Sequence, residues 1–114
     1  MTGKEAIEKL KKDFIQEHPS LTVDELEFTF REAFDYYASR AFPYDHNIQT
    51  LPDNRVADTR YIKAFMKDIV NMKDLPVNAA FKSYSENGMS YSLDESVFNQ
   101  DIAKLIIPKA KVIG

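Results

Sequence analysis

The sequence contains no cysteine and no tryptophan, and its only glycines stand at positions 3, 88 and 114. Without cysteine the chain has no disulfide, no thiolate metal site and no cysteine nucleophile. So few glycines leave no P-loop and no dinucleotide-binding glycine motif, and no G-x-S-x-G stretch occurs. No apolar run approaches the ~20 residues that cross a bilayer, and the charged N-terminus is unlike a signal peptide. We therefore expect a soluble, cytoplasmic protein without a cofactor.

What is present suits one globular domain. The chain has 114 residues, of which 44% are apolar and 29% charged, enough for a single core but not for two. We expect one domain over residues 1–108 and a short tail over 109–114. The 15 basic residues are outnumbered by 18 acidic ones, which argues against a broad basic surface for nucleic acid.

The charges are unevenly distributed along the chain. Residues 13–35 hold seven acidic side chains and one basic, whereas residues 55–73 hold five basic and two acidic, and the last thirteen residues hold three lysines and no acid. One interpretation is a set of solvated helix faces. The other is a molecule with a negative and a positive side, suited to head-to-tail self-association. Charge alone leaves both open.

Two helices are predicted in the N-terminal half. The first spans Lys4 to Glu17 and ends before Pro19, since a residue that precedes proline avoids the α region. The second begins after Thr22, where Glu25 completes a capping box, and runs to about Arg40. Apolar side chains at helical spacing give each an inward stripe: Ile7, Leu10 and Phe14, then Leu26, Phe30, Ala33, Phe34, Tyr37 and Ala38.

A loop over Phe42–Asn54 separates these helices from two more. The third helix is predicted from Arg55 to Leu75, where Pro76 stops it. The last is predicted from about Glu95 to Ile107, capped by Asp94 or Ser96 and ended by Pro108. Its expected core face is Val97, Phe98, Ile102, Leu105 and Ile106.

Between these helices the sequence predicts a β-hairpin over residues 81–94. Asn87 and Gly88 are the favoured pair for a two-residue type I′ turn, in which both residues have positive φ. The turn puts an apolar set on one face (Tyr84, Met89, Tyr91 and Leu93) and mostly serine on the other. That apolar face either packs on the protein's own helices or contacts a neighbouring subunit or partner. The predicted fold is mainly α, a small bundle of about four helices with one hairpin and an extended tail.

No catalytic constellation stands out. His46 with Asp45 and Asp53 matches no metal-binding motif, and paired carboxylates at helix starts are explained by capping. The loop between the second and third helices is too long for a helix-turn-helix. The third helix carries basic side chains that could face phosphates, but no set of side chains suited to reading base edges accompanies them. The basic residues are Arg55, Arg60, Lys63 and Lys67. The sequence thus favours a binding or structural module over an enzyme.

The stretch KSYSENGMSYSLDES, followed by LIIPKAKV, resembles the C-terminal half of phage head–tail connector proteins. These are the adaptor, or head-completion, proteins of long-tailed double-stranded DNA phages, and the resemblance covers residues 80–113. It implies a virion-neck protein, assembled in the host cytoplasm, that forms a usually dodecameric ring beneath the portal and extends the DNA channel. Implied partners are further copies of itself, the portal protein, a head-closure (stopper) or tail-completion protein, and passing DNA in transient, non-specific contact.

Within that interpretation the apolar hairpin residues Tyr84, Met89, Tyr91 and Leu93 form the subunit or partner surface, around the turn at Asn87 and Gly88. The tail is expected to dock on the portal through Lys109, Lys111, Val112 and Ile113. The alternative is a small phage-encoded regulatory adaptor that binds one host protein through the same surfaces without a ring. A DNA-associated packaging accessory is a third possibility.

Overall fold

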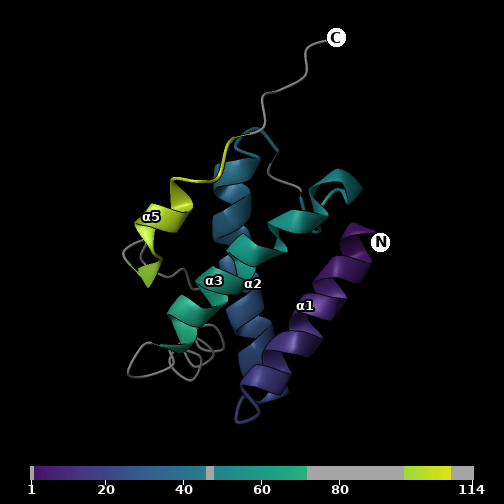
Figure 1. The fold of residues 1–114 in the computed structure, drawn as a ribbon, viewed down its shortest axis with the longest axis vertical. Helices are drawn as coiled ribbons and strands as arrows, with labels where there is room; N and C mark the ends of the chain where they lie inside the picture. The colour runs from purple at the N-terminus through teal and green to yellow at the C-terminus, as the bar shows by residue number, and fades with distance from the viewer. Residues whose placement is uncertain (1, 46–47, 72–96, 109–114) are drawn as a thin grey trace, which may run out of the picture.

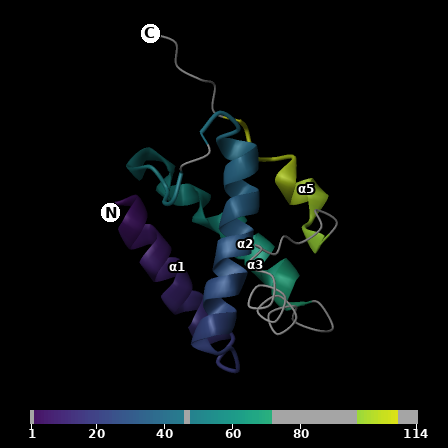
Figure 2. The ribbon, with the colours of Figure 1, turned by 180° about the vertical axis from the view of Figure 1, so that it is seen from behind.

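The computed structural model describes residues 2–45, 48–71 and 97–108. These residues form α1 (Gly3–Glu17), α2 (Val23–Ala41), the 3₁₀ helix η1 (Asp53–Asp58), α3 (Thr59–Val70) and the short α5 (Gln100–Ala103), and they include no strand. The mainly helical class is confirmed. The predicted hairpin over 81–94 and the tail over 109–114 lie outside the described residues. Figures 1 and 2 show α1 and α5 on opposite sides of α2, with α3 packed across it.

The second helix begins after Thr22 as its capping residue predicts, and α1 begins at Gly3, one residue before the expected Lys4. The hydroxyl of Thr2 accepts a hydrogen bond from the amide of Glu5 at 3.2 Å, and α1 buries Ile7, Leu10 and Phe14. In α2 the capping box is complete, because Thr22 Oγ1 accepts from the Glu25 amide at 3.1 Å and Glu25 Oε1 accepts from the Thr22 amide at 3.0 Å.

The third predicted helix is divided in two. Residues 53–58 form η1, in which Arg55 has the non-helical angles φ −119° and ψ 21°, and α3 begins only at Thr59. The cause is tertiary, since the side chain of Asp58 is bound by both Arg55 and Tyr37 of α2. These contacts hold η1 against α2, and a continuous α-helix from Arg55 would not follow the same backbone course. The described part of α3 ends at Val70.

The core is rich in aromatic rings. Phe14, Tyr37 and Phe65 have no exposed surface, and they come from α1, α2 and α3 respectively. Tyr36 stacks on Phe98, with ring centroids 4.3 Å apart, and meets Phe65 edge-on at 5.0 Å. These rings attach the C-terminal segment to the bundle.

The prediction of a last helix from Glu95 to Ile107 is wrong within the described residues. The α5 helix has only four residues, and its N-cap is Asn99, whose side chain accepts from the amides of Asp101 and Ile102. The backbone amide of Asn99 donates to Asp68 Oδ2 on α3 at 2.9 Å, which sets where the helix begins. Leu105, expected in the core, is 62% exposed.

The loop after α2 closes over the start of α1, so that two segments distant in sequence lie side by side (Figure 1). Leu51 is buried, and the amide of Gly3 donates to Asp53 Oδ1 at 2.7 Å. A Cβ atom on Gly3 would lie 1.6 Å from the carbonyl oxygen of Leu51. Glycine is therefore required at position 3 by this close backbone approach.

Candidate interaction surfaces

The residues assigned to interfaces from the sequence fall outside the part of the chain that the structure describes. This holds for the hairpin set (Tyr84, Asn87, Gly88, Met89, Tyr91 and Leu93) and for the tail set (Lys109, Lys111, Val112 and Ile113). Their assignments stay predictions. The described residues instead present two other surfaces.

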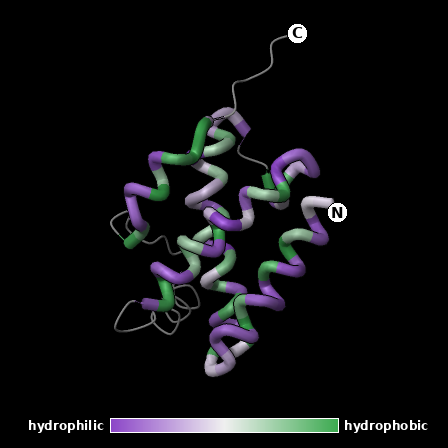
Figure 3. Tube along the Cα trace, viewed as in Figure 1, coloured by the Kyte–Doolittle hydropathy of each residue, from purple (hydrophilic) through white to green (hydrophobic). Residues whose placement is uncertain are grey.

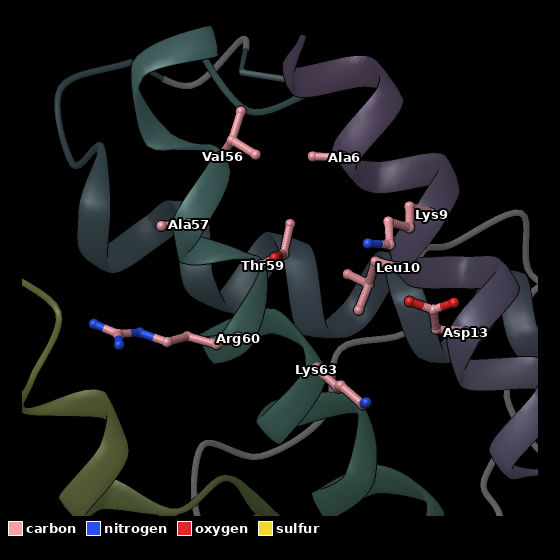
Figure 4. A pocket seen from close by; sticks show the side chains of 9 residues that line it. All are labelled: Ala6, Lys9, Leu10, Asp13, Val56, Ala57, Thr59, Arg60 and Lys63. Carbon is pink, nitrogen blue, oxygen red and sulfur yellow. The ribbon is translucent and has the colours of Figure 1, made fainter. Parts of the chain in front are cut away.

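The first surface is a groove of about 400 Å³ between α1 and the η1–α3 segment, here called the α1–η1 groove. Figure 4 shows Ala6 of α1 and Val56 of η1 facing each other across the gap, with Lys9 and Leu10 directed into it. Its lining combines small apolar side chains with three cations and one carboxylate: Ala6, Lys9, Leu10, Asp13, Val56, Ala57, Thr59, Arg60 and Lys63. The groove thus offers an apolar floor under a net positive rim.

The cations of this groove differ in their contacts. Lys63 Nζ donates to Glu17 Oε1 at 2.8 Å, and this hydrogen bond holds the pKa of the Glu17 carboxyl below its usual value. Arg60 is directed away from α1, and its guanidinium lies 4.9 Å from the centroid of the Tyr61 ring. Lys9, by contrast, extends into the gap (Figure 4). Lys9 is therefore the cation best placed to meet an occupant.

The position of η1, and with it one wall of the groove, depends on a polar cluster beneath it. The Tyr37 hydroxyl donates to Asp58 Oδ2, and Arg55 Nε donates to the same oxygen. Tyr37 has no exposed surface; its burial, and then its hydrogen bond to Asp58, raise the pKa of the phenol above the ordinary value. Because Val56 and Ala57 lie between Arg55 and Asp58 in the chain, this cluster holds them in place.

The second surface lies where the chain leaves the core after α5. Ile106 is buried, whereas Leu105 and Ile107 on either side of it are 62% and 76% exposed. Figure 3 shows this apolar segment beyond α5, running towards the end of α2. Arg40 Nε of α2 donates to the carbonyl of Ala103 at 3.3 Å and anchors its base. The signal that identifies it in the sequence is three branched residues before a proline, which favours extended backbone with alternating sides.

The opposite charges noted in the sequence partly neutralise each other within the chain. Glu17 of the acidic stretch pairs with Lys63 of the basic one, and Lys11 of α1 pairs with Glu27 of α2 at 3.2 Å. Arg55 and Arg60 are held by side chains of their own chain. Arg55 of η1 and Lys63 of α3 are thus paired with carboxylates of their own chain.

Among residues 2–45, 48–71 and 97–108, no three histidine, aspartate or glutamate side chains gather as a metal site; His46 lies outside these ranges. No helix in the described part of the chain has the length and apolar character needed to span a membrane.

Comparison of the chain with protein-family models, with curated proteins and with solved structures found no match.

Proposed function

We propose that the chain is a structural head–tail connector subunit of a phage neck, which catalyses no reaction. It forms a ring under the portal and extends the DNA channel. In the sequence, the proposal is supported by the resemblance of residues 80–113 to phage head–tail connector proteins. The observation that carries the proposal is the exposure of Leu105 and Ile107, at the start of the LIIPKAKV stretch. An apolar pair left uncovered by its own chain is suited to burial against another one.

The helical body supports a scaffolding role for this surface. The segment that presents the exposed pair is attached to α2 and α3 by Phe98, which is 4% exposed, and by the contact between Asn99 and Asp68. An interface residue held on a rigid base loses less conformational entropy when it binds. This geometry suits a protein that acts by docking.

The proposal is tested by quantifying the protein in purified phage particles by mass spectrometry, relative to the major capsid protein. A connector ring corresponds to about a dozen copies per particle. Absence from particles would overturn the proposal and favour the regulatory adaptor, for which the same exposed pair would contact one host protein.

The surface itself is tested by replacing Leu105 and Ile107 with serine. Because both side chains are exposed, the double variant is expected to melt within a few degrees of the wild type, yet to enter particles in reduced number. The matched control replaces the buried Ile106 with alanine, which lowers stability by about 2–5 kcal/mol instead. Normal incorporation of a folded double variant would remove this surface from the proposal.

A further inference from the structure

An exposed apolar side chain lies at the start of α2. Val23, the first residue of this helix, is 75% exposed, and the exposed Asp24 follows it. We call the two residues the Val23–Asp24 turn. Neither residue lines the α1–η1 groove, and Figures 1 and 2 both show the α1–α2 connection at the opposite end of α1 from η1, one of the elements that form the groove. The molecule therefore carries the acidic Val23–Asp24 turn and the cationic α1–η1 groove on separate surfaces.

The groove has the complementary chemistry. Within its volume of about 400 Å³, the apolar wall open to an occupant is Val56, which is half-buried, and Ala57, which is exposed, whereas Ala6 and Leu10 are already buried. Lys9 extends into the same gap, and Asp13, the one carboxylate of the lining, lies between Lys9 and Lys63 in the view of Figure 4. An occupant that fits brings a small apolar residue next to a carboxylate, and opposite charges of this kind set the orientation of an interface.

We propose that the α1–η1 groove receives the Val23–Asp24 turn of a second copy of this chain. Val23 packs against Val56 and Ala57 of the neighbour, and the carboxylate of Asp24 pairs with the ammonium group of Lys9. The exposed C-terminal pair is a poorer occupant, because Lys104 precedes it and would meet the cationic rim. The inference rests on the proposed function, to whose ring it adds one subunit contact.

The separation of the two surfaces determines the type of assembly. Val23 and Asp24 are exposed in the folded chain and do not belong to the lining of the α1–η1 groove, so the turn does not fill the groove of its own molecule. Each copy then offers its groove to one neighbour and its turn to the next. Such a heterologous contact generates a closed ring if the rotation closes.

Cysteine cross-linking tests the contact directly, because the natural chain has no cysteine of its own. Two full-length single variants, Val23→Cys and Ala57→Cys, are mixed at high concentration and oxidised; both positions are exposed. A disulfide-linked heterodimer between positions 23 and 57 is expected in excess over either homodimer. The matched control pairs Val23→Cys with Gln16→Cys, an exposed residue of α1 that does not line the groove. Equal yields from the two mixtures would overturn the contact.

Charge exchange tests its chemistry. Lys9→Glu and Asp24→Lys are each expected to weaken self-association about tenfold by placing like charges together. The double variant, which restores an opposite pair at every contact, should recover most of that loss, whereas Lys4→Glu outside the groove should change little. Losses that add in the double variant would contradict the pairing of Lys9 with Asp24. Thermal melts of each variant separate these effects from unfolding.

The same cross-link distinguishes the contact from the proposed function. With both cysteines in one chain, particles that contain the protein but form no link between positions 23 and 57 overturn the contact and leave the connector role intact. A link in the purified protein together with absence from particles overturns the connector role alone. Linkage of position 57 to a cysteine at position 107 would show that the C-terminal segment occupies the groove, and would also refute the inference.

Discussion

The close approach of the loop to the start of α1 makes Gly3→Ala the most informative single change. The new Cβ would lie 1.6 Å from the carbonyl oxygen of Leu51 and 2.5 Å from its carbonyl carbon. Both distances are far below van der Waals contact, so the loop must retreat by about 1.5–2 Å. The obstacle is backbone and not a side chain that can change rotamer.

The cost of that retreat follows from what it disrupts. Moving the loop stretches the 2.7 Å hydrogen bond from the Gly3 amide to Asp53, and a hydrogen bond to a charged group contributes about 1.5–3 kcal/mol. It also exposes part of Leu51, whose complete burial contributes about 1.5–3 kcal/mol. Alanine returns about 0.5–1 kcal/mol through its higher helix propensity. We expect a net loss of about 2–4 kcal/mol, which corresponds to a fall in Tm of about 10–20 °C.

The assay is thermal and urea unfolding followed by circular dichroism. Lys4→Ala, at the exposed next position, is the matched control and should leave the midpoint almost unchanged. Asp53→Ala removes the hydrogen bond without the clash, and should cost about 1.5–3 kcal/mol. If Gly3→Ala is as stable as the wild type, the loop does not lie on α1 in this way and the reasoning is refuted.

Three further variants test the core. Tyr37→Phe should lower stability by about 1–3 kcal/mol in urea unfolding, because it leaves Asp58 short of one hydrogen-bond donor, and an unchanged midpoint would contradict the cluster. The pKa of Tyr37 is raised in the folded state, so the folded protein holds the phenol proton more tightly than the unfolded chain does. The resulting contribution to the free energy of unfolding is complete below pH ~10 and is lost as the pH rises further. In unfolding measured from pH 8 to 11, Tyr37→Phe should therefore lose less stability at alkaline pH than the wild type. Thr29→Val should raise Tm, because the buried Thr29 hydroxyl has no partner among the described residues, and a lower Tm would indicate a bond that the structure lacks. Phe98→Ala should lower the free energy of unfolding by about 3–5 kcal/mol, and limited proteolysis should cleave residues 97–106 earlier than it cleaves α2. Cleavage of both segments at the same rate would show that residues 97–106 do not detach independently of the bundle.

The two interaction surfaces were only partly accessible from the sequence. The α1–η1 groove combines residues 6–13 with residues 56–63, and no local pattern indicates that these segments lie together. The exposed pair has a local signal, yet the spacing of Leu105 from Phe98 and Ile102 also fits a helix and predicts Leu105 in the core. Pro108 favours extended backbone at Ile107, and here that preference prevailed over the helical spacing.

The sequence by itself determined α1, α2 and the mainly helical class. The capping box of Thr22 and Glu25 and the apolar stripe that begins at Ile7 are local, since each depends on residues no more than a few turns apart. Only the tertiary structure decided that η1 interrupts the third helix and that Asn99 begins the last one. In both places a side chain on another helix, Tyr37 or Asp68, binds the segment and outweighs its helix propensity, which is a weak preference of under about 1 kcal/mol per residue.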